Sequence, residues 1–219
     1  MSRRTLHRRS LGLCPYDEAL ALMDGAVEAR LAGGADTVLV VRHPPVITVG
    51  RKRGSELHVR DAEGLPVVPV PRGGDVTFHG EGQIVLYPIV ALEGADRDLH
   101  RFMRDLEEAC IRALVGWGVS GRRDEGRTGV WVGARKIASV GIAVRRWVTY
   151  HGLSLNVLAE PRFRTIVPCG LDGVVMTSME EESGRAPGMA EVADALVAAF
   201  AAVRGYEIVV PAGEDTCVG

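Results

Sequence analysis

Three strand-like segments follow one another in the middle of the chain, and they constrain the fold more than any other feature of the sequence. They cover residues 130–132, 136–144 and 148–157 and are rich in apolar and β-branched residues. Only short turns separate them, and turns this short join antiparallel neighbours in a sheet. The sequence therefore predicts a sheet that is mixed or antiparallel and not purely parallel.

Further elements flank these strands. Apolar residues at helical spacing predict helices over residues 15–31, about 98–117 and about 188–203. More strands or extended segments are expected, and the arginine-rich N-terminus is interpreted as a first strand; the others cover residues 37–41, 46–50, 66–71, 84–90 and 206–210. We predict an α/β (α+β) fold in one domain, residues 1–219, with a mixed, largely antiparallel sheet flanked by helices.

The most unusual local stretch covers residues 166–179. Cys169 stands there between Pro168 and Gly170. Proline restricts the backbone on one side of the thiol, and glycine admits conformations closed to other residues on the other side. Core cysteines usually lie on an apolar helical face or in a strand. The position on a bend therefore makes Cys169 a candidate reactive thiol.

The remaining cysteines fit simpler interpretations. Cys14, Cys110 and Cys217 show no short pairing, and a chain this large does not need disulfides for stability, so all four thiols are expected to be reduced. Cys110 falls on the apolar stripe of the helix near residues 98–117 and is predicted to be a core residue, whereas Cys217 is interpreted as an exposed thiol. The six histidines form no i, i+4 pair, so no metal site is predicted.

Lysine is rare in this chain. Of 26 basic residues only two are lysine, Lys52 and Lys136. Arginine cannot replace an amine that must lose a proton, because its pKa stays above about 12. Lys52 lies in the motif RKRG and is interpreted as part of a solvated basic turn. Lys136 lies in a strand-like run, which makes it the candidate functional lysine.

Residues 72–83, with the sequence RGGDVTFHGEGQ, are rich in glycine. Such a composition suits a backbone that approaches a ligand closely and offers bare N–H groups to it. The alternative is a hairpin loop with no binding role. A phosphate-binding loop is disfavoured, because the spacing fits neither of the familiar glycine-rich nucleotide motifs.

Overall charge and hydropathy exclude several classes of protein. The formal net charge of −2 argues against a general nucleic-acid binder. No apolar run approaches the roughly 18 residues needed to span a bilayer. The basic N-terminus is followed by no apolar region of the kind found in secretory signals, so a cytoplasmic protein is expected.

Four sequence blocks carry a resemblance to a known family. They are RGGDVTFHGEGQ (72–83), GVWVGARKIASVG (129–141), YHGLSLNV (150–157), and IVPCGL (166–171) with TSM (177–179). In this order they resemble the blocks of the octanoyl-(acyl-carrier-protein):protein N-octanoyltransferases, the lipoyl(octanoyl) transferases of lipoate biosynthesis. The blocks span about half of the chain. Glu81 stands where the family usually has proline, and Asp75 where glutamine is common.

The resemblance implies a fold like the catalytic domain of biotin/lipoate protein ligases and a Cys/Lys dyad. Octanoyl would move from the phosphopantetheine thioester of acyl carrier protein to Cys169, and from there to a lysine ε-amine. Lys136 would lower the thiol pKa and later take a proton from the incoming amine. His79 is a possible helper in proton movement, or a histidine that only forms hydrogen bonds. The residues implied to line the acyl site and supply N–H groups for an oxyanion are Arg72, Gly73, Gly74, Asp75, Val76, Thr77, Phe78, His79, Ser139, Val140, Gly141, Gly152, Leu153 and Ser154.

The implied partners are acyl carrier protein, the lipoyl domains of 2-oxoacid dehydrogenase complexes and the glycine cleavage H protein, with no nucleic acid, no membrane and a monomeric enzyme. No cofactor is implied beyond the phosphopantetheine that the carrier protein brings. Two alternatives remain open: an ATP-dependent lipoate or biotin protein ligase, and a non-catalytic binder of acyl carrier protein.

Both implied protein substrates are acidic as classes, so an arginine-rich rim would favour docking. The candidates are Arg51, Arg53, Arg122, Arg123, Arg145 and Arg146, with a solvated surface as the simpler interpretation for most of them. The acidic run at residues 180–182 is expected to be a solvated loop.

Overall fold

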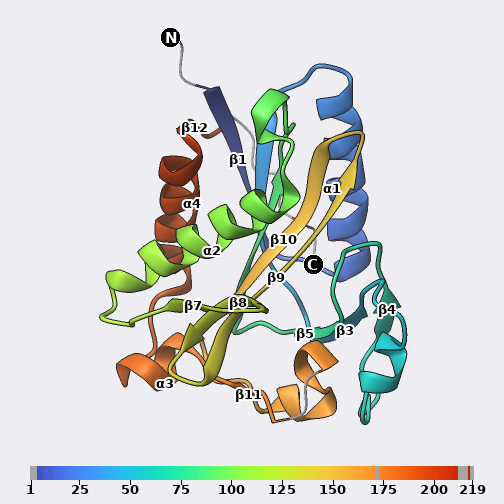
Figure 1. Ribbon diagram of the computed structural model, residues 1–219, viewed down its shortest axis with the longest axis vertical. Helices are drawn as coiled ribbons and strands as arrows, with labels where there is room; N and C mark the ends of the chain where they lie inside the picture. The colour runs from blue at the N-terminus through green and yellow to red at the C-terminus, as the bar shows by residue number, and fades with distance from the viewer. Residues whose placement is uncertain (1–3, 171–172, 212–216, 218–219) are drawn as a thin grey trace.

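The computed structural model describes residues 4–170, 173–211 and 217, and for Cys169 it describes the backbone alone. Figure 1 shows one large twisted sheet with helices on both sides and a smaller sheet at one edge. No helix in the described part of the chain has the length and apolar character needed to cross a membrane.

Nine strands of the described residues form the large sheet. They are β1 (Arg4–Leu13), β2 (Asp36–Arg42), β6 (Gln83–Ile89), β7 (Arg122–Asp124), β8 (Arg127–Val132), β9 (Arg135–Arg145), β10 (Val148–Asn156), β11 (Val175–Met176) and β12 (Tyr206–Val209). The order across the sheet is β12-β1-β2-β6-β10-β9-β8-β7, and β11 pairs with β9.

The large sheet contains both parallel and antiparallel strand pairs. β1 is parallel to β2 and β12, and β11 is parallel to β9. Every other pair, from β2–β6 through β7–β8, is antiparallel. The prediction of a mixed, largely antiparallel sheet is confirmed, and the three central strands have the expected hairpin connections.

The small sheet lies beside the large one and carries the glycine-rich loop. In the described residues its order is β4 (Val67–Pro69), β3 (Val46–Val49) and β5 (Val76–His79). Where the chain is described, four short 3-10 helices complete the connections: η1 (Ser55–His58), η2 (Gly94–Asp96), η3 (Pro161–Thr165) and η4 (Pro168–Gly170).

Helices cover both faces of the large sheet. α1 (Tyr16–Leu31) packs on one face, while α2 (Leu99–Val115) and α4 (Met189–Arg204) pack together on the other. The predicted start of α2 is confirmed, because the Asp98 carboxylate accepts a hydrogen bond from the Arg101 N–H. Cys110 is fully buried on this helix, as predicted.

Strand residues alternate between the two hydrophobic cores. In β2, Val38 and Val40 pack toward α2 and α4, whereas Leu39 and Val41 pack toward α1. Successive side chains of a strand point to opposite faces, so a strand covered on both faces is apolar throughout. This explains the continuous β-branched run that predicted the strand.

The acidic run at residues 180–182 is not a loop. It belongs to α3 (Met179–Ser183), whose N-cap Ser178 accepts a hydrogen bond from the Glu181 N–H. Glu182 is ion-paired with Arg135 of β9 at 2.9 Å and accepts a hydrogen bond from the Thr177 hydroxyl at 2.6 Å. The run therefore anchors the segment after Cys169 to the sheet.

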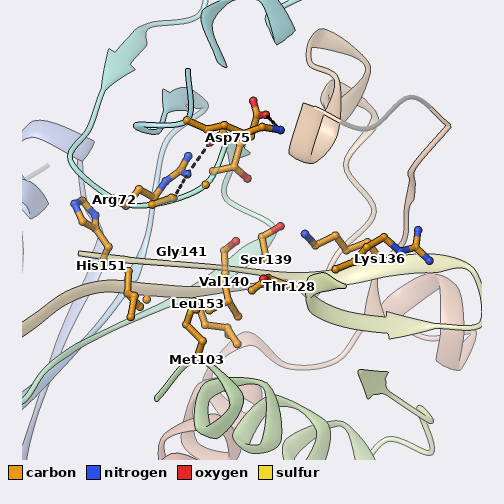
Figure 2. Close-up of a pocket in the computed structure, with 18 of the residues that line it drawn as sticks. Arg72, Asp75, Met103, Thr128, Lys136, Ser139, Val140, Gly141, His151 and Leu153 are labelled. Carbon is orange, nitrogen blue, oxygen red and sulfur yellow. Dashed lines mark hydrogen bonds and ion pairs between the residues drawn. The ribbon is translucent and has the colours of Figure 1, made fainter. Parts of the chain in front are cut away.

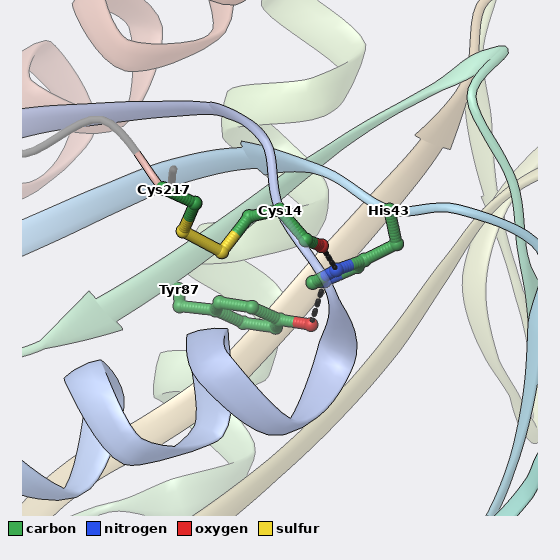
Figure 3. Close-up of a disulfide and its surroundings, with 4 residues drawn as sticks. All are labelled: Cys14, His43, Tyr87 and Cys217. Atoms are coloured by element: carbon green, nitrogen blue, oxygen red, sulfur yellow. Dashed lines mark hydrogen bonds between the residues drawn. A yellow bond between two sulfur atoms is a disulfide. The ribbon is translucent and has the colours of Figure 1, made fainter. Parts of the chain in front are cut away.

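The prediction of four reduced thiols is wrong for two of them. Cys14 and Cys217 form a disulfide with their Cα atoms 5.2 Å apart, although 203 residues separate them in the sequence. Figure 3 shows this disulfide beside His43, which bridges the Cys14 carbonyl and the Tyr87 hydroxyl. Two cysteines separated by 203 residues form no short spacing pattern in the sequence, so the sequence does not indicate this disulfide.

Candidate active site

Lys136 lies on β9, and its side chain crosses the neighbouring strand β8. The residue is 2% exposed, and its Nζ lies 5.6 Å from the centroid of the Trp131 ring, close enough for a cation–π contact. A Cβ on Gly129 would overlap the Lys136 side chain. Gly129, the first residue of the block 129–141, therefore makes room for the lysine.

The segment 166–179 is attached to the same strand. β11 pairs with β9 so that Met176 lies opposite Lys136, and the Thr177 N–H donates to the Lys136 carbonyl at 2.9 Å. The bend η4 is held from its other side, because the Val167 N–H donates to the His58 carbonyl at 2.7 Å. The segment that contains Cys169 is thus fixed against the strand that contains Lys136, while the thiol itself lies outside the described part of the structure.

A cavity of about 680 Å³ opens beside Lys136. Figure 2 shows residues that line it, among them Ser139 and Val140 of β9, Leu153 of β10 and Met103 of α2. Thirteen of the fourteen predicted binding residues contribute to its lining: Arg72, Gly73, Gly74, Asp75, Val76, Thr77, His79, Ser139, Val140, Gly141, Gly152, Leu153 and Ser154. The cavity has both the volume and the apolar wall needed for a medium-length acyl chain.

Phe78 is the predicted binding residue that the cavity does not include. Its ring is fully buried in a separate cluster with Ile47 and stands edge-to-face against Phe163 at 5.5 Å between centroids. Its neighbours Thr77 and His79 line the cavity, so alternation along β5 turns Phe78 to the other face. Sequence blocks alone do not distinguish these two faces.

The position of the cavity follows from an open edge of β9. The pairing of β8 with β9 extends from Arg135 to Ala138, whereas β10 pairs with β9 as far as Arg145. The glycine-rich loop returns to this edge further along, where the Gly73 N–H donates to the Ile142 carbonyl at 2.8 Å. Between Ala138 and Ile142 the strand is bordered by the cavity.

Arg72 holds the glycine-rich loop in place. Its guanidinium is buried and donates to the Asp75 carbonyl at 2.7 Å, and to the carbonyl and hydroxyl of Thr48 at 3.0 and 2.9 Å. A Cβ on Gly141 would lie 3.2 Å from the Arg72 Cδ, so the glycine allows the arginine to cross β9. The expectation of bare N–H groups is wrong for Gly73, since its N–H is bonded to β9.

Several lining residues were not predicted as binding residues. Leu99 and Met103 of α2, Trp131 of β8, and Tyr87 and His151 of β6 and β10 all border the cavity. The first two were expected only as members of an apolar helix stripe. A stripe identifies the buried face of a helix but not whether that face meets a wall or a cavity.

Burial keeps the histidines near the cavity neutral. Desolvation lowers the pKa of His43 to about 4 and that of His151 to about 3, and in His151 the nearby Arg72 charge acts in the same direction. Burial also holds the pKa of His79 well below its ordinary value, with further contributions from His43 and Arg72. None of the three is therefore an imidazolium at neutral pH.

His79 belongs to a buried chain of hydrogen bonds that ends beside Lys136. Its Nδ1 lies 3.1 Å from the Gln83 Oε1, and the Gln83 Nε2 donates to the Asn156 Oδ1 at 2.9 Å. Asn156 in turn donates to the carbonyl of Thr177, the residue bonded to the Lys136 carbonyl. Since Gln83 uses its amide as donor, its oxygen accepts from a His79 Nδ1–H.

The six arginines considered for a docking rim have different surroundings. Arg145 is paired with Asp24 and Glu28 of α1 at 2.9 and 2.8 Å, and it lies nine residues along β9 from Lys136, roughly 30 Å away. Arg123 is similarly paired with Glu108 at 2.8 Å. These arginines stabilise the fold and do not border the cavity. Of the six candidates, the exposed ones are Arg51, Arg53, Arg122, Arg123 and Arg146.

Comparison with known proteins shows which family this chain resembles. Residues 15–201 match the family described as lipoyl protein ligase A/B catalytic domain. An octanoyltransferase of Geobacter metallireducens is 44% identical over 194 residues, which cover 88% of this chain and 90% of that protein. An octanoyltransferase of Mycobacterium sp. strain KMS is 43% identical over 204 residues, covering 90% and 84%.

Solved structures share the fold at lower sequence identity. The crystal structure of lipoate-protein ligase A bound with ATP has a TM-score of 0.73 and 17% identity, covering 99% of this chain and 90% of that one. A biotin protein ligase from Aquifex aeolicus has a TM-score of 0.54 and 12% identity, covering 93% and 69%. These similarities confirm the predicted biotin/lipoate protein ligase fold.

Proposed function

The chain belongs to the octanoyltransferase family, whose reaction transfers octanoyl groups for protein lipoylation, and from this premise we propose that Cys169 and Lys136 carry out the transfer. Residues 1–219 then form one octanoyltransferase domain. The observation that supports the assignment is the attachment of segment 166–179 to β9 at Lys136, beside a cavity with an apolar wall.

In the first half-reaction the Cys169 thiolate attacks the thioester carbonyl of octanoyl-acyl carrier protein. The C–S bond to phosphopantetheine breaks as the C–S bond to Cys169 forms, and the leaving carrier thiolate takes a proton from the Lys136 ammonium, so that Lys136 is neutral when the acyl-enzyme has formed. Exchange of one thioester for another is nearly isoenergetic, so the acyl group stays activated without ATP. A cysteine of ordinary pKa is only a few per cent ionised at neutral pH, and the Lys136 ammonium stabilises the thiolate by its opposite charge.

In the second half-reaction the ε-amine of a lipoyl-domain lysine attacks the Cys169 thioester. An amide bond forms, the Cys169 thiolate leaves, and the amine must lose a proton. Lys136 in its neutral form accepts that proton, a step that an arginine at this position cannot perform. Val140, Leu153 and Met103 hold the acyl chain out of water during both steps.

The proposed partners are acyl carrier protein as donor and, as acceptors, lipoyl domains of 2-oxoacid dehydrogenases and the glycine cleavage H protein. The enzyme is proposed to act as a monomer in the cytoplasm, without a cofactor of its own.

Disulfides are uncommon in the cytoplasm. Acid-quenched thiol trapping in cells should therefore show whether Cys14 and Cys217 are paired there, and a fully oxidised pair would count against the location.

Intact mass after mixing with octanoyl-acyl carrier protein, without ATP, tests the chemistry. The unaltered enzyme should gain one octanoyl group, and Cys169→Ala should gain none and transfer none to a lipoyl domain. Cys110→Ala is the matched control, because that thiol is buried in the core. A Cys169→Ala protein that still octanoylates the lipoyl domain would overturn the assignment. Product formed only from free octanoate and ATP would indicate a ligase instead, and binding of the carrier without an adduct would indicate a non-catalytic protein.

A further inference from the structure

Asp75 forms the centre of a charged cluster at the end of the glycine-rich loop. Its side chain is 3% exposed. The Lys52 Nζ lies 2.8 Å from one carboxylate oxygen, and the His58 Nδ1 lies 2.7 Å from the other. The Val76 N–H donates to the same oxygen as His58, at 2.8 Å. One buried carboxylate therefore joins three segments of the chain.

The cluster lies directly against the bend that contains Cys169. A Cβ on Gly170 would overlap the Asp75 Oδ2 and the His58 ring, and Gly170 has a φ of +61°. Both properties require glycine at this position. Backbone bonds reinforce the contact, since the His58 carbonyl accepts from the Val167 N–H and Val59 forms a bridge with Ile166.

Charge near this bend has a direct effect on a thiol nucleophile. A carboxylate alone would disfavour the thiolate, whereas nearby cations favour it. Burial by itself raises the pKa of Asp75, but the hydrogen bonds from Lys52, His58 and the Val76 N–H outweigh it and lower that pKa. Asp75 is therefore ionised at neutral pH, and Lys52 offsets its charge.

We infer that Asp75, Lys52 and His58 form a positioning cluster, which fixes the 168–170 bend and balances the charge next to the nucleophile. The inference rests on the proposed role of Cys169. Lys52 supplies the cation of the cluster, Asp75 is the anchor that holds it, and His58 is the donor that ties the carboxylate to η1. The cluster orients Cys169 through Gly170 and takes no part in bond formation.

Other titratable groups surround the same bend and enter the expected pH dependence. Lys136 lies on β9 opposite Met176 of β11, which follows the bend in the sequence, and η1 also carries the exposed Glu56. His79 on β5 is kept neutral by burial. These groups are unchanged when Lys52 or Asp75 is altered. Their effect on the pH dependence of Cys169 is therefore the same in every variant.

Alkylation of Cys169 by iodoacetamide as a function of pH, followed by peptide mass mapping, tests the cluster independently of octanoyl transfer. Lys52→Met removes a cation and should raise the midpoint of the alkylation profile by about 0.5–1 pH unit. Asp75→Asn removes the anion and should lower the midpoint by a similar amount. Arg53→Met, which removes an exposed cation next to Lys52, should leave the midpoint unchanged.

Opposite shifts from two nearly isosteric changes are not expected of a purely structural contact. His58→Asn keeps a donor toward Asp75, so the midpoint of its alkylation profile should equal that of the unaltered enzyme. His58→Leu has no such donor, so its midpoint should differ from that of the unaltered enzyme and most of the acylation rate should be lost. Circular dichroism and thermal unfolding identify any variant that does not fold. Midpoints for Lys52→Met and Asp75→Asn that agree with the unaltered enzyme would overturn the inference, and activity of Cys169→Ala would instead overturn the proposed function.

Discussion

The two lysines of this chain border the same cavity but stand in different physical settings. Lys136 is 2% exposed on a central strand, next to an indole ring. Lys52 lies in an irregular loop, its side chain is 49% exposed, and it is paired with a buried carboxylate. The first setting suits the proton transfer proposed for Lys136, and the second suits an ion pair that fixes a loop.

The difference extends to the groups around each lysine. Lys136 lies against the uncharged Trp131 ring, and the cavity histidines His79 and His151 are kept neutral by burial. On the Lys52 side the charges are present and compensated, because Asp75 is held ionised by its partners. The charged groups around Lys52 are therefore paired with one another, whereas the histidines that border the cavity carry no charge.

The sharpest test of this comparison is the same substitution at both lysines. Lys136→Arg keeps the charge but cannot lose a proton, so octanoyl transfer should fall by about 10³-fold, within the range of general acid–base effects. Lys52→Arg keeps everything that the charged cluster requires, so transfer should stay within about threefold. Steady-state kinetics with octanoyl-acyl carrier protein and a lipoyl domain measures both. Equal losses would show that the two lysines do not differ in role.

A second prediction concerns the neutrality of the cavity side. His43 and His151 have pKa values of about 4 and about 3 in the folded protein, below their ordinary value of 6.5. The unfolded chain therefore binds more protons below pH 6.5, and the free energy of unfolding should fall as the pH drops from 7.5 to 5. The expected loss is about 2 kcal/mol for each histidine.

Urea unfolding at several pH values measures this loss. His43→Gln should reduce the slope of unfolding free energy against pH by about one proton, whatever its effect on absolute stability. A slope that His43→Gln does not change would mean that His43 is protonated in the folded enzyme.

A third prediction compares two glycines at the nucleophile bend. Gly170 and Gly173 both have positive φ, but a Cβ on Gly173 would meet open space whereas one on Gly170 would overlap Asp75 and His58. Gly173→Ala should cost only about 1 kcal/mol of backbone strain. Gly170→Ala should add the displacement of the bend and lower the acylation rate at least about tenfold.

Thermal unfolding and single-turnover acylation separate these two effects. If Gly170→Ala were as active as Gly173→Ala, the contact between the charged cluster and the bend would have no part in acylation.

Much of the fold was predictable because it depends on local pattern. Alternating and continuous apolar runs located the strands, and the apolar stripe with its Asp98 cap located α2. The proposed catalytic pair also came from the sequence, through the unusual cysteine bend and the scarcity of lysine, and it stays a prediction. The α3 helix was not predictable, because a five-residue helix has too few turns to show periodicity. The orientation of Phe78 was not predictable either, because the sequence blocks do not show which face of β5 borders the cavity.

The sequence by itself determined the mixed sheet, the core helices, and Cys169 and Lys136 as the residues of interest. Only the tertiary structure decided which groups Lys52 contacts. The contacts of Asp75 with Lys52, His58 and Gly170 join segments up to about a hundred residues apart. Such contacts are set by how the glycine-rich loop packs against the bend, and a polar turn has no periodicity that would reveal its partner.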